Sequence, residues 1–248
     1  LTEAKKSLIS EVVTGKKKIT VDNGKLIVEN RKAEDMKDSG VEWLGMIPKE
    51  WGVKRIKDIA QLNKSSLSNN ENDNLEINYI DIGSVNSNGE IKEIQSFTFS
   101  TAPSRARRIT NKNDIIVSTV RTYLKAISYI ENDYSNLICS TGFAVFTPNS
   151  TNVIPKFFYF MIKSELYINE IVKRSTGVSY PAINASQIAD FNCSFPSIEN
   201  QNVIIEFLDE KTAKIDNTIE KIKVQIEKLK EAKQSLISEA VTGKIEVR

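Results

Sequence analysis

The 248-residue sequence contains no histidine. A Ser-His-Asp triad, a Cys-His pair, an HExxH zinc site and a histidine general base are therefore excluded. Cys139 and Cys193 are the only cysteines, too few for a disulfide framework or a thiolate metal cage. The missing histidine and the two cysteines therefore exclude the commonest catalytic mechanisms and predict no metal site. The low cysteine content also predicts a reducing, cytoplasmic compartment.

Two further absences narrow the class of protein. The ten glycines never form a GxG pattern, and the P-loop spacing of Gly40 and Gly45 is followed by Met46 and Ile47 rather than Lys-Ser/Thr. No apolar run is long enough to span a bilayer, and the first residues do not resemble a signal peptide. The sequence therefore predicts no bound nucleotide cofactor and no membrane segment.

Positive charge is concentrated in one segment, although the net charge is only +2. Residues 100–126 carry six basic side chains and one acid, Asp114, which gives this segment a charge of +5. The basic side chains are those of Arg105, Arg107, Arg108, Lys112, Arg121 and Lys125. A localised positive field of this kind favours a polyanionic partner despite the near-neutral total.

The two ends of the sequence repeat each other. Residues 1–16 match residues 229–244 at 13 of 16 positions. The closing copy continues a heptad pattern that predicts one helix of roughly 65 Å, starting at Ser197 or Glu199 and ending at Gly243. Its apolar seam comprises Ile215, Ile219, Ile222, Ile226, Leu229, Leu236 and Ala240, with Lys233 within it. We therefore expect residues 1–16 to be the end of an equivalent preceding helix.

The seam predicts a helical partner, because the rod exceeds what a domain of about 150 residues can cover. A helix packed along its own domain is the alternative. The predicted organisation is the end of a preceding helix at 1–16, a hairpin and linker at 17–40, a globular domain at 41–198 and the long helix at 199–248.

The globular part has the pattern of an α+β domain with a mixed β-sheet. Asn23-Gly24 predicts a type I′ hairpin turn in the segment that precedes it. Strands are expected at 77–82, 114–119, 126–130 and 141–146, a helix at 155–173, and a short helix at 185–189. The run from Phe157 to Phe160 could stack bases, but at helical spacing it is more typical of a core.

Six segments, in order, resemble one family. They are VEWLGMIPKEW, APSRARRI, DIIVSTVRTYLKAI, STGFAVFTP, GVSYPAINASQI and FPSIENQNVIIEFLDEKTAKID. Together they are similar to the specificity (S) subunits of type I restriction-modification enzymes, over roughly residues 41–244. The sequence departs from the usual adjacent Glu-Gln at IENQNVI and has one recognition domain where the family has two.

The resemblance implies a target-recognition domain that reads one half of a split double-stranded DNA site. It implies that the long helix docks methyltransferase (M) subunits and, through them, restriction (R) subunits. AdoMet, ATP and Mg²⁺ would belong to those partners. We expect the single domain to be completed by a homodimer with antiparallel helices, through Ile215, Ile219, Ile222, Ile226, Leu229 and Leu236.

The expected DNA-binding residues come from the basic segment and from the loop KRSTGVSYPAI. Strand alternation in VSTVRTYLK would place Val120, Thr122 and Leu124 on one face and the cationic and aromatic side chains on the other. Arginine can bind guanine or phosphate, and tyrosine can stack or donate. The set comprises Arg105, Arg107, Arg108, Arg121, Tyr123, Lys125, Lys173, Arg174, Ser179 and Tyr180. A solvated basic face, or a loop that packs Tyr180, is the structural alternative.

Two other functions fit parts of the sequence. Asp81, Glu90 and Lys92 resemble the D…ExK pattern of Mg²⁺-dependent nucleases, in which two carboxylates hold the metal. Acid-x-Lys spacing also occurs elsewhere in the sequence, and Asn88-Gly89 predicts a turn that leaves Glu90 in solvent. A coiled-coil scaffold with an incidental basic patch is the second alternative.

Overall fold

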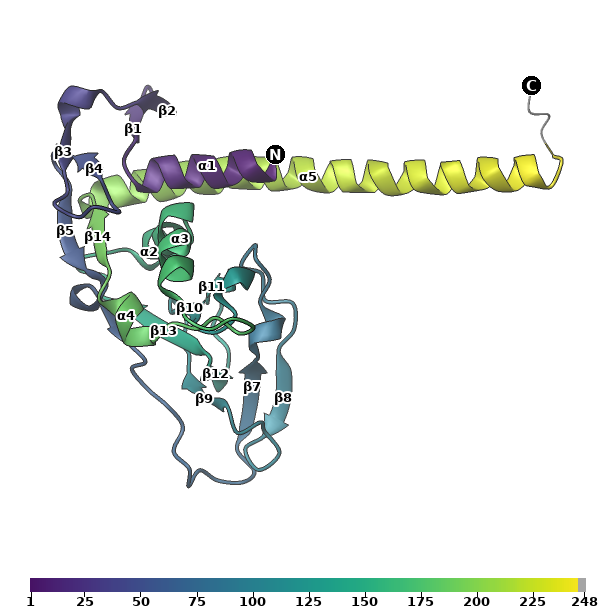
Figure 1. The fold of residues 1–248 in the computed structure, drawn as a ribbon, viewed down its shortest axis with the longest axis horizontal. Coiled ribbons are helices and arrows are strands. Elements are labelled where there is room, and N and C mark those ends of the chain that lie inside the picture. Colours follow the sequence, from purple (N-terminus) through teal and green to yellow (C-terminus); the bar gives the residue numbers. More distant parts are fainter. Residues whose placement is uncertain (245–248) are drawn as a thin grey trace.

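A long helix and a domain at one end of it define the architecture (Figure 1). The computed structural model describes residues 1–244. Helix α5 (Ile198–Val241) runs past the domain as a rod, and α1 (Thr2–Val13) lies beside its first half. At 1.5 Å per residue, the 44 residues of α5 span about 66 Å. The predicted rod is therefore confirmed.

Both ends of α5 have the caps that the sequence predicts. The Ser197 hydroxyl accepts a hydrogen bond from the backbone N–H of Asn200, which satisfies one of the free donors of the first turn. Gly243 adopts a φ of +71° just after the last turn, a conformation in which a side chain is unfavourable. The helix limits are thus local properties of the sequence.

The first of two four-stranded sheets lies near the helices. It is antiparallel throughout, in the order β11-β10-β13-β6. Its strands are β6 (Ala60–Leu62), β10 (Ile115–Ser118), β11 (Ile127–Tyr129) and β13 (Phe143–Pro148). Every residue of β10 is buried, which agrees with its continuous apolar run.

The second sheet has the order β8-β7-β12-β9 and lies farther from α5 (Figure 1). It comprises β7 (Glu76–Ile80), β8 (Gln95–Thr98), β9 (Ala106–Ile109) and β12 (Leu137–Ser140). Strand β12 pairs parallel with β7 and antiparallel with β9, so this sheet is mixed. The α+β class with a mixed sheet is confirmed.

Within residues 1–244, the remaining strands form three two-stranded pairs, and there are four short 3-10 turns. The pairs are β1 (Lys17–Asp22) with β2 (Lys25–Asn30), β3 (Met36–Asp38) with β4 (Met46–Pro48), and β5 (Gly52–Arg55) with β14 (Asn192–Phe195). The turns are η1 (Ala33–Asp35), η2 (Ile56–Asp58), η3 (Ile82–Ser84) and η4 (Thr122–Leu124). Asn23 and Gly24 both have positive φ, and Asp22 pairs with Lys25, as the predicted hairpin requires.

The predicted helix at 155–173 is two helices. Helix α2 (Pro155–Ile162) ends at Lys163, and α3 (Glu165–Arg174) starts after Ser164. The Ser164 hydroxyl donates to the carbonyl of Met161, and Ser164 itself is in an extended conformation that interrupts the helix. The single-helix prediction was wrong because apolar periodicity continues across this break. The short helix α4 (Ala185–Ala189) occurs as predicted.

The largest core joins the helices to the first sheet. Phe157 and Phe158 are fully buried and Phe160 nearly so, which confirms their assignment to the core rather than to a stacking surface. Ile9, Val12 and Val13 of α1 belong to the same core, together with residues of α5. The first helix is therefore packed against the domain. Within residues 1–244, no helix has both the length and the apolar character needed to cross a membrane.

Candidate nucleic-acid interface

A surface formed by η4 and the loop at residues 175–182 brings several predicted residues together. We call these two segments the η4 surface. The backbone N–H of Ile183 donates to Thr119, and Val120 forms an isolated bridge with Ala182. The Thr122 hydroxyl donates to that of Ser175 at 2.8 Å. The loop is thus fixed to the turn by backbone and side-chain bonds.

Arg121 and Tyr180 form the centre of this surface. The Arg121 guanidinium carbon lies 4.9 Å from the centroid of the Tyr180 ring, within cation–π range. Tyr180 is 65% exposed and Tyr123 is 52% exposed. Within the described residues, the Arg121 guanidinium has no hydrogen-bond partner, so its N–H groups are available to a ligand.

The expected strand alternation in VSTVRTYLK was wrong. Strand β10 ends at Ser118, and residues 122–124 form the 3-10 turn η4. Arg121 and Lys125 flank it with φ of +50° and +56°, the left-handed region that L residues enter at a cost. Thr122 is buried while Leu124 is exposed, so they do not share a face. Arg121 and Tyr123 still reach solvent because the turn projects them outward.

Arg105 lies at the same end of the domain as the η4 surface. Its carbonyl accepts a hydrogen bond from the N–H of Thr141, and the carbonyl of the adjacent Gly142 accepts one from Thr119. Arg105 is exposed, in the loop that leads into β9. These bonds connect Arg105, which precedes β9 of the second sheet, to Thr119, which follows β10 of the first sheet and leads into η4.

The other two arginines of the SRARRI segment are engaged inside the protein. Arg107 donates to the carbonyl of Ala106 at 2.9 Å and lies over the Phe99 ring at 4.9 Å. Arg108 donates to the Ser66 hydroxyl at 3.2 Å, and its Nε is buried. Both side chains are half-buried, so the basic segment exposes fewer cationic groups to a ligand than its sequence alone indicates.

The remaining predicted residues divide in the same way. Lys173 and Ser179 are exposed, and Lys125 is half-buried. Arg174 forms an ion pair with the buried Glu170 at 2.5 Å, and its guanidinium lies over the Phe191 ring at 4.8 Å. Sequence reasoning missed Val178, which is completely exposed at the loop tip between Gly177 and Ser179. Its signal was an aliphatic residue inside a polar, glycine-containing loop.

Each of the two nuclease-like carboxylates has partners within its own turn. The Asp81 carboxylate accepts hydrogen bonds from the Tyr79 hydroxyl and the Gly83 N–H, and it caps η3. Glu90 accepts from the Asn86 amide at 2.6 Å in the turn at Gly89. Within residues 1–244, no three His, Cys, Asp or Glu side chains are placed to hold one metal ion. These carboxylates are used in local turns.

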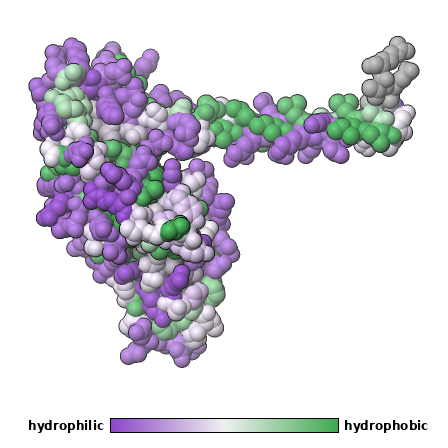
Figure 2. Space-filling model, in the orientation of Figure 1, coloured by the Kyte–Doolittle hydropathy of each residue, from purple (hydrophilic) through white to green (hydrophobic). Residues whose placement is uncertain are grey.

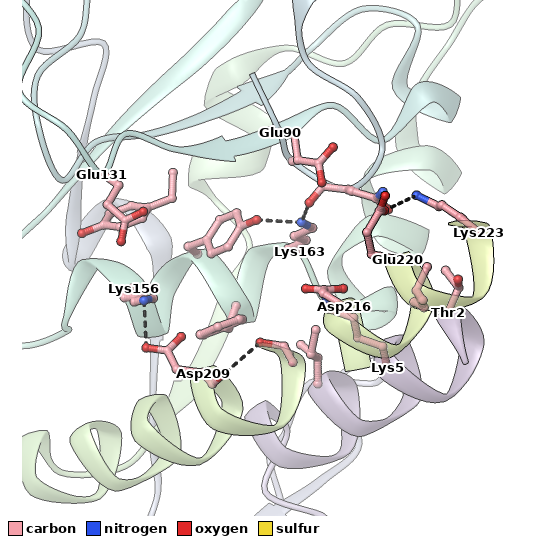
Figure 3. A pocket seen from close by; sticks show the side chains of 18 residues that line it. Thr2, Lys5, Glu90, Glu131, Lys156, Lys163, Asp209, Asp216, Glu220 and Lys223 are labelled. Carbon is pink, nitrogen blue, oxygen red and sulfur yellow. Dashed lines mark hydrogen bonds and ion pairs between the residues drawn. The ribbon is translucent and has the colours of Figure 1, made fainter. Parts of the chain in front are cut away.

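A separate cavity of about 460 Å³ lies where α1 and α5 meet the domain (Figure 3). Lys5 of α1 binds Asp216 of α5 at 2.6 Å, and Lys156 binds Asp209 at 2.8 Å. Lys163 donates to the Asn88 carbonyl and to the Tyr159 hydroxyl. Burial lowers the pKa of Lys163 to about 8, and the nearby charge of Lys5 acts in the same direction. The paired charges make this cavity a polar joint between the rod and the domain.

The structure is an α+β domain at one end of a long helix, with exposed cationic and aromatic side chains on the η4 surface. The sequence matches the family described as the type I restriction modification DNA specificity domain over residues 48–228. The chain belongs to this family.

Individual relatives agree with the assignment. The chain is 30% identical over 129 residues to the type I restriction enzyme HindI specificity subunit of Haemophilus influenzae, covering 48% of this chain and 28% of that one. It is 22% identical over 215 residues to the MjaVIII specificity subunit of Methanocaldococcus jannaschii, covering 83% and 48%.

Two solved structures share the fold at 26% identity. The HsdS subunit from Thermoanaerobacter tengcongensis matches with a TM-score of 0.62, over 69% of this chain and 44% of that one. A chain from work on complex assembly and conformational transition of the type I R-M system matches with a TM-score of 0.66, over 78% and 50%. The chain therefore spans half or less of the length of these relatives.

Proposed function

We propose that this chain is a non-catalytic DNA-recognition subunit of a type I restriction-modification system, and that its domain reads one half of a bipartite site. The observation that carries the proposal is the family match across 48–228, which includes both four-stranded sheets, the η4 surface and most of α5. The specificity subunits to which it is similar are components of such systems.

The η4 surface suits duplex recognition chemically. An arginine can donate two hydrogen bonds to guanine in the major groove, and tyrosine can donate or stack. Arg121 and Tyr180 already contact each other, so their orientation is partly fixed before a ligand binds. We assign DNA contact to the exposed members of the predicted set. Those members are Arg105, Arg121, Tyr123, Lys173, Arg174, Ser179 and Tyr180, and the half-buried Lys125 lies next to them on the flank of η4.

Three arginines of the predicted set have partners within the domain. Arg107 stacks on Phe99, Arg108 bonds Ser66, and Arg174 pairs with Glu170. Chemistry on the DNA would be performed by partner methyltransferase and restriction subunits, which would bind AdoMet, ATP and Mg²⁺. The local hydrogen bonds of Asp81 and Glu90 support this division over the nuclease alternative.

The free part of α5 suits a helical partner. Ile222, Ile226, Leu229 and Leu236 are exposed. Figure 2 shows hydrophobic surface along much of the rod. Burying each large aliphatic side chain contributes roughly 1.5–3 kcal/mol. We propose that a second copy of the chain covers this seam in an antiparallel two-fold pair, and that the paired helices dock the methyltransferase. Two inverted domains would then read the same half-site twice.

The DNA modified in the presence of this chain tests the proposal. The chain would be combined with a type I methyltransferase subunit and AdoMet, and methylated positions would be located by sequencing. We expect a bipartite, palindromic motif with a spacer of fixed length. Ile222→Asp with Ile226→Asp should leave a folded domain and abolish methylation of the split site. Methylation of an asymmetric motif, or methylation that persists in the double variant, would contradict it.

A further inference from the structure

The loop of the η4 surface contains a short backbone hairpin at residues 176–182, which we call the tip hairpin. The N–H groups of Thr176 and Ala182 each donate to the carbonyl of the other residue at 2.9 Å, and these two bonds close its base. Gly177 has a φ of +109°, and a Cβ there would lie 3.2 Å from the carbonyl oxygen of Tyr180. The chain therefore turns back tightly, and the shape of the hairpin is set before a ligand binds.

The tip hairpin is uncharged, although cationic side chains flank it. Residues 176–182 contain no acidic or basic side chain. The Arg121 guanidinium lies over the Tyr180 ring, and the exposed Lys173 is in the last turn of α3, just before the hairpin. Cationic side chains bind the phosphates of DNA, whereas sequence is read by polar and apolar contacts to base edges. The flanking cations suit the DNA backbone, and the hairpin itself suits base edges.

Val178 gives the tip hairpin an apolar end. Within the described residues, it is the most exposed large hydrophobic side chain, at 102%. A single exposed aliphatic residue is ordinary on a protein surface. Val178 differs because Tyr123, Leu124 and Tyr180 are also exposed on the η4 surface. Apolar side chains between cations favour a ligand that presents apolar groups between its negative charges.

The dimensions of the tip hairpin fit the major groove of DNA. That groove is about 12 Å wide and about 8.5 Å deep and admits a two-stranded ribbon, whereas the minor groove is only about 6 Å wide. Val178 comes two residues after Thr176. At about 3.3 Å per residue, it extends at most roughly 7 Å beyond the base of the hairpin. Val178 can therefore reach a base edge while the flanking cations stay near the phosphates.

We propose that the tip hairpin enters the major groove and that Val178 contacts the C5-methyl group of a thymine in the half-site. Among the four base edges in that groove, thymine presents a methyl group, while the other bases present hydrogen-bond donors and acceptors. Arg121 then contacts a neighbouring base pair or phosphate. The proposal rests on the DNA recognition proposed above and deepens it by naming a base and the residue that specifies it.

Replacement of thymidine by deoxyuridine tests the contact in the chain combined with its methyltransferase subunit. Deoxyuridine forms the same base pair and lacks only the C5-methyl group. Each thymidine of the methylated motif would be replaced singly, and affinity would be measured by fluorescence anisotropy. We expect one position at which replacement weakens wild-type binding about fourfold, the effect of losing one buried methyl group. Val178→Ala should weaken binding of the thymidine duplex by a similar factor, and replacement at that position should then have no further effect.

Val21→Ala is the matched control, because Val21 is 57% exposed on β1, outside the η4 surface. This variant should show the wild-type affinity for both duplexes. Val178→Ala should also keep the wild-type melting temperature, because its side chain is fully exposed. A change in affinity without a change in stability assigns the effect of Val178→Ala to DNA contact.

The possible results separate this contact from recognition as a whole. A half-site without an A·T pair, or a deoxyuridine effect that persists unchanged in Val178→Ala, would overturn the thymine contact. A gain in affinity from 5-methylcytosine without any deoxyuridine effect would also overturn it, because the methyl group would then belong to cytosine. A motif that is bound and methylated equally with every deoxyuridine duplex would overturn the contact and leave the recognition proposal intact. Absence of any sequence-specific binding would overturn both proposals.

Discussion

Replacing Arg121 with alanine should remove a central contact of the proposed DNA interface. Within the described residues, the Arg121 guanidinium has no hydrogen-bond partner, and its carbon lies 4.9 Å from the Tyr180 ring centroid. A bidentate arginine–guanine contact discriminates by about 1–3 kcal/mol, which corresponds to roughly 5- to 150-fold in affinity. A phosphate contact would instead reduce the log-log salt slope by about 0.9. Alanine enters the left-handed region at a cost similar to that of arginine, so the backbone is a small confounding factor.

The measurement is fluorescence anisotropy of the chain with its methyltransferase subunit, from about 50 to 200 mM salt. One duplex contains the methylated motif and the other contains a scrambled motif. Lys32→Ala serves as the control, because it removes the same charge from an exposed site whose partner is Glu34. Arg121→Ala should lose affinity for the motif at least fivefold more than for the scrambled duplex, or lose about one unit of slope on both. Unchanged affinity, discrimination and slope would refute the assignment.

Three other changes test separate parts of the reasoning. Arg105→Ala should lower the salt slope by about 0.9, whereas Arg108→Ala should mainly lower the melting temperature because Arg108 bonds Ser66; equal slopes for wild type and Arg105→Ala would exclude Arg105 from the interface. Glu90→Ala and Lys92→Ala should leave methylation and cleavage by the assembled system intact. Loss of either activity while DNA binding is retained would support the hypothesis of a Mg²⁺-dependent nuclease site. The pKa of Lys163 is lowered from 10.5 to about 8, so between these pH values the unfolded chain binds more protons than the folded chain. The free energy of unfolding should therefore rise with pH in this range. Denaturant titrations at pH 8 and pH 10 should show a smaller rise for Lys163→Met than for the wild type.

Structural features that depend on residues close together in the sequence could be predicted. The limits of α5 depend on Ser197 and Gly243, and the first hairpin depends on Asn23-Gly24, all within a few residues of the structure they determine. The aromatic run in α2 was correctly assigned to the core because its spacing is helical. The repeat also identified the two helical segments, although it gave no sign that one is seated and the other free.

Features that depend on distant contacts were missed. The η4 turn needs positive φ at Arg121 and Lys125, which no glycine or asparagine signals, and it is anchored by Ser175. The partners of Arg107 and Arg108 are Phe99 and Ser66, which come close only when the second sheet forms. A basic sequence thus fixes total charge, while tertiary packing decides which cations remain free for a ligand.

The double attachment of the domain has a mechanical consequence. The chain enters the domain from α1 and leaves it into α5, and the Lys5–Asp216 and Lys156–Asp209 ion pairs connect α1, α5 and α2 around one cavity. A domain joined to a helix by a single linker can rotate relative to that helix, whereas a domain attached at two neighbouring points is held in one orientation. On duplex DNA, one added base pair rotates the next half-site by about 34° and advances it about 3.4 Å. A domain held rigidly on α5 cannot follow that rotation. A DNA site whose spacer differs by a single base pair should therefore not be bound at both half-sites, rather than be bound weakly at both.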